Sequence, residues 1–177
     1  REDIFKICRF YSTHQNSEKF VSLDQYLERM KPEQSEIYYM SGENLNALKN
    51  SPQIEGFKSR NIEVLFFTDT IDDFWLQNCK EYNGKTFKSV TQGDIDLPDS
   101  KTEDAPEDKN DHNDLLAAIL NVLKEEVENV RASKRLTDSA VCLVASESGV
   151  DMHMERVLKI HQKYAGSTKP VLEINIQ

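Results

Sequence analysis

The chain has 177 residues, and 38% of them are hydrophobic, which is enough apolar material for one medium domain or two small ones. Its 31 acidic residues outnumber 22 basic ones, and the formal net charge of −9 opposes binding to nucleic-acid phosphates and anionic lipids. No apolar run approaches the roughly 18 residues that are needed to span a bilayer. We therefore expect neither a nucleic acid nor a membrane as a partner.

The cysteines and the first residues indicate the cellular setting. Cys8, Cys79 and Cys142 are widely spaced, which suits neither a disulfide framework nor a metal-binding pair. We expect reduced thiols and a cytoplasmic location. The opening REDIFKICRF has no uninterrupted apolar stretch followed by a cleavage site, so it is not a signal peptide. It also lacks an initiator Met, and we expect a segment of a longer protein.

Two helical stretches are predicted near the N-terminus. Apolar residues between Glu2 and Phe10 indicate the end of a helix. After a polar loop, Ser22 and Gln25 form a capping-box pattern that begins a short helix. The pair Lys31-Pro32 is expected to end it.

Strands and helices then alternate in a β-α-β-α-β pattern, which predicts a small parallel sheet with right-handed crossovers. The middle strand is the most apolar, as expected for a central strand covered on both faces. The three strands are predicted at residues 37–40, 62–67 and 86–90.

The connections between these strands carry helix and turn signals. Ser41 is expected to cap a helix whose Leu45 and Leu48 face inward, and a further short helical piece begins at residues 54–57. The run Thr68-Asp69-Thr70 is expected to cap a helix that continues to about residue 82. The pair at 83–84, Asn-Gly, predicts a turn.

An acidic segment separates this pattern from the rest of the chain. Residues 94–114 hold nine acidic residues against Lys101 and Lys109, with two prolines and no aromatic residue. Such a composition cannot bury a core. We therefore predict a first unit at residues 1–93, an acidic linker at 94–110 and a second unit at 111–177.

The second unit opens with an amphipathic helix. Its apolar stripe consists of Leu115, Leu116, Ile119, Leu120, Leu123 and Val127. Strands are predicted at 130–136 and 140–145, joined by a turn at Thr137-Asp138. A helix over 150–164 and a strand over 170–176 follow. The fold class is α/β, with a small three-layer parallel-sheet unit followed by a small α+β unit.

Catalytic and nucleotide-binding motifs are missing from the sequence. The six glycines are not clustered into a phosphate-binding loop. His153 and His161 are eight residues apart, too far for a helical metal pair, and Ser146 and Ser148 have no histidine at a telling position. Neither a cofactor site nor catalytic residues are therefore expected in this segment.

Three acidic residues follow the strongest strand, where α/β folds often place metal or ligand sites. They are Asp69, Asp72 and Asp73. The simpler interpretation is that they cap the following helix and suit its positive end. The alternative is a small α/β enzyme that uses Asp69 or Asp72, with Mg²⁺ as its metal.

Two apolar features suit protein binding. Phe74 and Trp75 lie about 100° apart on a helix, so both cannot point into the same core, and an exposed ring beside Asp73 would suit adaptable contacts. The alternative is that Trp75 packs on the sheet and Phe74 covers a neighbour.

The second feature is a methionine-bearing helix face. Val150, Met154, Val157 and Leu158 share one face, and Met152 lies to its side. Flexible thioethers suit promiscuous apolar contacts. The alternative is ordinary core packing.

Long strings of this sequence resemble the heat-shock protein 90 chaperones in their bacterial form. The most specific are IYYMSG, LKNSPQIEGFKSRNIEVLFFTDTIDDF and EYNGKTFKSVT, which resemble the end of the family's middle domain. RASKRLTDSAVCLVAS, MERVLK and PVLEIN resemble the opening of its C-terminal domain. The resemblance covers nearly the whole chain except the acidic linker.

The resemblance implies a segment of an ATP-dependent chaperone that contacts unfolded or partly folded client proteins and links the middle domain to the dimerisation domain. ATP and Mg²⁺ would bind in an N-terminal domain outside this chain, so the segment itself is not an enzyme. The final helices that pair two protomers of the full-length parent would also lie outside it.

The resemblance also implies client-binding residues. Bacterial members place an acid and a Trp after the strong strand; Asp73 and Phe74 match these positions, and a Trp stands one residue later at 75. The methionine-bearing helix of the C-terminal domain is also a client surface in the family. Its matching residues are Val150, Met154, Val157 and Leu158.

Overall fold

The computed structural model describes most of the chain, as the ranges below specify. These are residues 2–14, 20–69, 71–72, 76, 79–92, 95, 97, 109–146, 151–160 and 168–176. The chain divides into two compact units, Arg1–Val90 and Thr91–Gln177. Among the described residues, none of the helices combines the length and the apolar character that a membrane crossing requires.

The first unit is built on a mixed sheet with the strand order β1-β3-β2-β5-β4. The three inner strands are parallel, and each edge strand is antiparallel to its neighbour. The strands are β1 (Tyr11–Ser12), β2 (Glu36–Ser41), β3 (Leu65–Phe67), β4 (Glu81–Tyr82) and β5 (Lys85–Ser89). The three predicted strands thus form the parallel centre of the sheet, with β2 in the middle.

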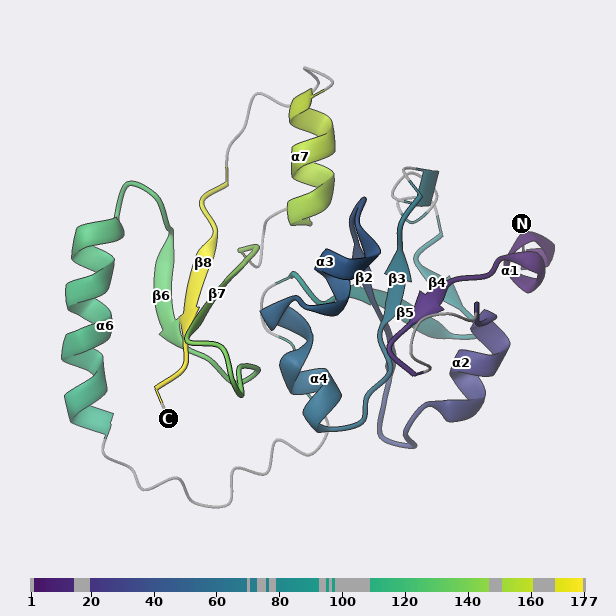
Figure 1. Ribbon diagram of the computed structural model, residues 1–177, viewed down its shortest axis with the longest axis horizontal. Helices are drawn as coiled ribbons and strands as arrows, with labels where there is room; N and C mark the ends of the chain where they lie inside the picture. The colour runs from purple at the N-terminus through teal and green to yellow at the C-terminus, as the bar shows by residue number, and fades with distance from the viewer. Residues whose placement is uncertain are drawn as a thin grey trace. The chain divides into compact units, whose positions relative to one another are not determined.

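Helices cover both faces of this sheet (Figure 1). On one face, Ile37 of β2 packs in a cluster with Leu23 and Tyr26. On the other face, the neighbouring Tyr38 makes an edge-on contact with Phe57, their ring centroids 4.9 Å apart. The first face carries α1 (Glu2–Ile7) and α2 (Leu23–Arg29), and the second carries α3 (Leu45–Lys49), η1 (Pro52–Ile54) and α4 (Glu55–Ser59). The result is a three-layer unit.

Local sequence signals explain several of these boundaries. The Ser22 hydroxyl accepts a hydrogen bond from the Gln25 N–H, and the Gln25 side chain accepts one from the Ser22 N–H, which confirms the capping box of α2. Asn83 and Gly84 have φ angles of 48° and 74°. Two successive positive φ angles suit the tight turn of a β-hairpin, here between β4 and β5.

Two predicted helix limits are wrong. Ser41 does not cap α3, because it is the last residue of β2 and pairs with Phe67 of β3. Asn44 caps α3 instead, since its Oδ1 accepts from the Ala47 N–H at 3.1 Å. The helix expected to reach about residue 82 ends earlier, because Tyr82 lies in β4 and pairs with β5.

The second unit contains a three-stranded sheet with the order β6-β8-β7. β8 is parallel to β6 and antiparallel to β7, so the last strand lies between two strands that precede it in the chain. Its elements are α6 (Lys109–Leu123), β6 (Asn129–Ala132), β7 (Val141–Val144), α7 (Met152–Ile160) and β8 (Val171–Ile174). Helices and mixed sheets in both units confirm the α/β fold class.

The structure describes only part of the predicted acidic linker and part of the helix predicted over residues 150–164. α6 begins at Lys109, within the segment that was expected to be linker, and most of residues 94–108 lie outside the described part of the chain. α7 is described as far as Ile160. The predicted helix end near residue 164 therefore lies outside the described residues.

Among its described residues, the second unit combines an apolar cluster with buried ion pairs. An apolar cluster contains Leu136, Cys142, Val144 and Val171. Beside it, the buried Glu173 carboxylate forms ion pairs with the side chains of two arginines. The contacts are 2.8 Å to Arg131, 2.9 Å to Arg135 and 3.0 Å to the Ser133 hydroxyl. These contacts join β6, β8 and the loop after β6.

Candidate functional site

The acidic residues after β3 form a helix start. The Asp72 carboxylate accepts a hydrogen bond from the Asp69 N–H at 3.3 Å, and the Asp69 carbonyl accepts one from the Asp72 N–H at 3.0 Å. Asp72 is buried. Among the residues that the structure describes, no three His, Cys, Asp or Glu side chains are grouped so as to hold a metal ion. The helix-capping interpretation accounts for these contacts, and the alternative of an Mg²⁺-dependent enzyme has no support.

Three of the predicted client-binding residues belong to the first unit. Asp73, Phe74 and Trp75 lie outside the described residues. Ile71, two residues before them, is 64% exposed. The sequence analysis did not single out Ile71, because a lone isoleucine between polar residues carries no signal that separates an exposed side chain from a buried one.

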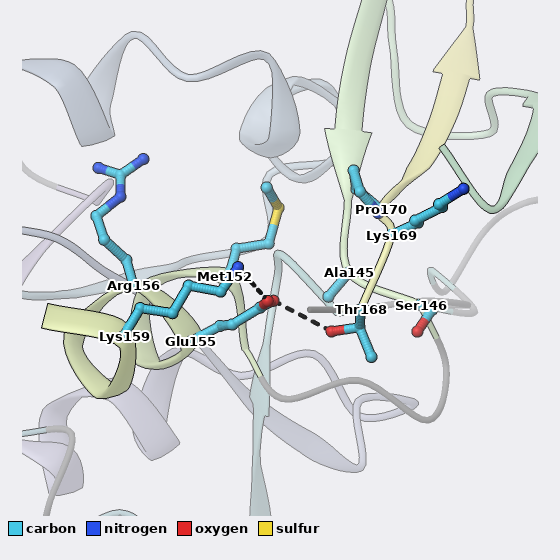
Figure 2. Close-up of a pocket in the computed structure, with 9 residues that line it drawn as sticks. All are labelled: Ala145, Ser146, Met152, Glu155, Arg156, Lys159, Thr168, Lys169 and Pro170. Carbon is cyan, nitrogen blue, oxygen red and sulfur yellow. Dashed lines mark hydrogen bonds and ion pairs between the residues drawn. The ribbon is translucent and has the colours of Figure 1, made fainter. Parts of the chain in front are cut away.

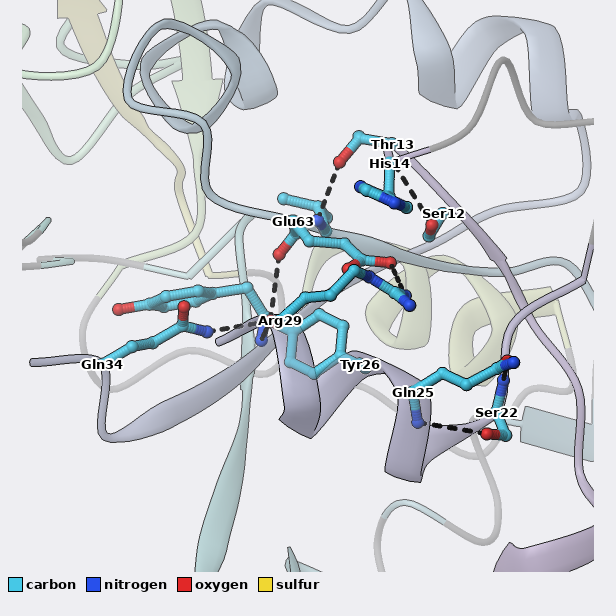
Figure 3. A network of polar contacts seen from close by, with 11 residues as sticks. Ser12, Thr13, His14, Ser22, Gln25, Tyr26, Arg29, Gln34 and Glu63 are labelled. Carbon is cyan, nitrogen blue, oxygen red and sulfur yellow. Dashed lines mark hydrogen bonds and ion pairs between the residues drawn. The ribbon is translucent and has the colours of Figure 1, made fainter. Parts of the chain in front are cut away.

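A polar network in the same unit joins α2 to β2 and to the segment before β3 (Figure 3). The Tyr26 hydroxyl accepts hydrogen bonds from Gln34 Nε2 at 2.9 Å and the Tyr38 N–H at 3.0 Å, and it donates to the Glu63 carbonyl at 2.9 Å. Arg29 forms a two-pronged ion pair with the Glu63 carboxylate at 2.8 and 2.9 Å. Burial raises the pKa of the Tyr26 phenol well above its usual value, so this hydroxyl stays neutral and structural.

The methionine-bearing helix α7 begins with a buried aspartate. Asp151 Oδ1 accepts from the His153 N–H at 2.9 Å, as a helix cap does, and Asp151 Oδ2 accepts from the Thr91 hydroxyl. Thr91 is the first residue of the second unit, and its carbonyl accepts from the Ala145 N–H at 2.7 Å. The start of α7 is thereby tied to the first residue of its unit. The sequence analysis did not identify this contact, since it joins residues that are far apart in the chain.

A cavity of about 230 Å³ lies beside α7 (Figure 2). One side comes from α7 and the other from the end of β7 and the residues that lead into β8. Its lining residues are Ala145, Ser146, Met152, Glu155, Arg156, Lys159, Thr168, Lys169 and Pro170. The lining combines an apolar part, formed by an alanine, a methionine and a proline, with a cationic part.

A single carboxylate organises the polar side of the cavity. Glu155 forms an ion pair with Lys159 at 2.7 Å and accepts a hydrogen bond from the Thr168 hydroxyl at 3.1 Å. The Lys159 ammonium holds the pKa of the Glu155 carboxyl below its usual value, and the Thr168 hydroxyl acts in the same direction. The contact to Thr168 holds α7 against the segment that leads into β8.

The structure places the other client-binding candidates of α7 in different settings. Met152 is partly buried and lines the cavity. Val157 is buried, with 9% of its surface exposed. Val150 lies outside the described residues, as do the side chains of Met154 and Leu158, whose backbones belong to α7. Arg156, Lys159 and Lys169, which the sequence analysis did not single out, share the cavity with Met152.

One known protein family matches the chain over its whole length. The Hsp90 protein family matches residues 1–177. The chain therefore belongs to the Hsp90 family.

Individual relatives specify the bacterial form. The chain is 46% identical over 182 residues to the chaperone protein HtpG of Wolbachia pipientis wMel, covering 99% of the chain and 28% of that relative. It is 44% identical over 181 residues to the chaperone protein HtpG of Roseobacter denitrificans, covering 99% and 29%. The protein of the same name from Ehrlichia ruminantium strain Gardel is 41% identical over 186 residues, with 99% and 29% covered. The chain thus spans a little more than a quarter of the length of these relatives.

Proposed function

We propose that this chain is the client-contacting segment of an ATP-dependent molecular chaperone of the bacterial Hsp90 type. The observation that carries the proposal is the cavity beside α7, which the partly buried Met152 lines on a helix that polar contacts hold at its start and at Glu155. Family membership over all 177 residues and relatives named as chaperones support it. A flexible thioether is suited to varied apolar side chains of unfolded proteins.

The proposal assigns separate tasks to the two units. The first unit is the end of the chaperone's middle domain, and the second is the first part of its C-terminal domain. Together they link the middle domain to the dimerisation domain of the full-length protein. ATP and Mg²⁺ bind outside these residues, and the client side chains are contacted by Met152 and by the candidates at 73–75, 150, 154 and 158, whereas the predicted Val157 is buried.

The test is suppression of client aggregation by the full-length protein that carries this segment. Met152→Gln should weaken the binding of an unfolded model client, because the apolar wall of the cavity becomes polar. Val122→Gln is the matched control, since Val122 is 79% exposed on α6 and does not line the cavity. Equal client affinity for the wild type and both variants would remove the cavity from the proposed function.

A further inference from the structure

The cavity beside α7 differs in charge from the chain that carries it. Its lining includes three cationic side chains, Arg156, Lys159 and Lys169, and a single acidic one, Glu155. The whole chain has a net charge of −9. A cationic site on an acidic protein attracts anionic groups locally while the remaining surface repels them. This contrast bears on which client segments can be bound.

We infer that the cavity accepts an acidic side chain of the client, next to an apolar residue that packs on Met152. This inference rests on the proposed client-binding function and specifies the chemistry of the partner. The guest carboxylate pairs with the Arg156 guanidinium at one edge of the lining, and the adjoining apolar side chain packs on Met152. The chain therefore selects client segments in which an acidic and an apolar residue are neighbours.

The size of the cavity agrees with a side-chain guest. Pockets that hold drug-sized molecules have volumes of about 300–1,000 Å³. The volume here is about 230 Å³. That space admits one or two side chains, and it is small for a complete nucleotide or a comparable ligand.

The arrangement of the charged groups favours an anionic over a cationic guest. The negative charge of Glu155 is already balanced, because its carboxylate pairs with the Lys159 ammonium at 2.7 Å and accepts a hydrogen bond from the Thr168 hydroxyl at 3.1 Å. The exposed Arg156 guanidinium has no hydrogen bond or ion pair to the described residues. In Figure 2 the Arg156 side chain points away from Thr168 and Pro170, and the Lys169 side chain projects on the far side of the lining, away from Arg156. A carboxylate can therefore gain a partner at Arg156 without breaking an existing pair.

On the opposite side of the lining, the ion pair of Lys169 is longer than the pair between Lys159 and Glu155. The Lys169 ammonium donates to the Lys124 carbonyl at 2.8 Å and lies 3.9 Å from the Glu125 carboxylate, which is itself largely exposed. The buried Ser146 hydroxyl has no hydrogen-bond partner among the described residues. A hydroxyl can rotate to donate to an acceptor, so the lining holds one more group that can bind a guest oxygen.

The test uses the full-length protein and three short synthetic peptides of one apolar sequence, carrying Glu, Gln or Lys at the same position. The Glu peptide should bind several-fold more tightly than the Gln peptide, since an exposed charge pair contributes roughly 0.2–1 kcal/mol, or about 1.4- to 5-fold in affinity. The Lys peptide should bind most weakly. The Glu preference should shrink as the salt concentration rises.

Matched variants assign the preference to this cavity. The double variant Arg156→Gln with Lys169→Gln should lose the Glu preference and keep the affinity for the Gln peptide. The double variant Lys80→Gln with Lys134→Gln removes the same charge from exposed positions outside the cavity and should keep the preference. Arg156→Lys should retain most of it.

The outcomes separate this inference from the proposed function. Equal binding of the three peptides to the wild type overturns the acidic-guest inference while client binding stands. An equal loss of preference in both double variants also overturns it, because the effect then comes from net charge. If neither the peptides nor an unfolded client protein binds, the proposed function fails as well.

Discussion

The two units of this chain are stabilised in different ways. The first unit buries large aromatic and aliphatic side chains on both faces of its sheet, and Phe57, Leu65 and Ile37 are completely buried. Among its described residues, the second unit combines a cluster of four buried residues with a buried carboxylate, Glu173, that is held by two arginines. Burial of apolar area stabilises a fold without requiring a particular orientation of the groups, whereas a buried ion pair depends on its geometry and on both partners. The first unit therefore suits a scaffold, and the second is more sensitive to single polar changes.

The largest expected effect concerns the aromatic core of the first unit. Phe57→Ala should lower the free energy of unfolding by roughly 3–5 kcal/mol, because it leaves a cavity against Tyr38. Urea unfolding of the full chain, with hydrogen exchange at β2 as the local readout, measures it. Ile71→Ala is the control: this side chain is 64% exposed, and its loss should change stability by less than about 0.5 kcal/mol. A similar loss in both variants would contradict the described core.

The second prediction addresses the ionic core of the second unit. Glu173→Gln should lower the free energy of unfolding by about 3 kcal/mol, since it removes the carboxylate that pairs with the buried Arg135 and with Arg131. Hydrogen exchange at β6 and β8 should accelerate, while exchange at β2 stays unchanged. If the substitution is tolerated with no measurable loss, the second unit is stabilised chiefly by apolar packing, and the contrast between the units disappears.

The third prediction concerns the attachment of α7. Asp151→Ala removes both the helix cap and the acceptor of the Thr91 hydroxyl, and it should cost about 2 kcal/mol. Thr91→Val removes only the second contact and should cost about 1 kcal/mol. The hydrogen-exchange rates of the backbone amides of α7 measure both effects. An Asp151→Asn variant, which keeps the cap, should resemble Thr91→Val more than Asp151→Ala.

The smallest expected effect is a pH dependence at Glu155. The pKa of this carboxyl is lowered in the folded protein, so its contribution to stability is present above the ordinary glutamate pKa and is lost as the pH falls through the lowered value. The contribution should be about 0.5 kcal/mol, as for a helical pair four residues apart. Comparing the wild type with Glu155→Gln between neutral and acidic pH isolates it. A stability difference that grows on acidification would have the wrong sign.

Local signals in the sequence were sufficient for much of the first unit. The capping box at Ser22 and Gln25 and the turn at Asn83-Gly84 depend on residues that are adjacent or nearly so, and the structure confirms both. Strands β2 and β3 were recognisable because buried parallel strands need nearly continuous apolar runs, and β5 was recognisable from its place directly after the Asn83-Gly84 turn. The limits of α3 and of the helix after β3 were wrong because strand pairing, with partners distant in sequence, overrode the local capping signals.

The candidate site also combines features that local sequence signals predict with features that arise only from contacts between distant segments. The sequence analysis placed Met154 on the predicted helix face and Met152 to its side, and the structure places Met152 in a cavity, while the Met154 side chain lies outside the described residues. The cations that share this cavity come from α7 and from residues 168–170, which only the return of the chain through β8 brings together. Likewise, the contacts of Glu173 with Arg131 and of Asp151 with Thr91 span about 40 and 60 residues. Sequence alone determined the fold class and most local elements, because these depend on residue type and short spacing, and its long matching strings carried the resemblance to the family. Tertiary structure decided the strand order, the buried ion pairs and the charge of the cavity, because each depends on distant segments meeting in space.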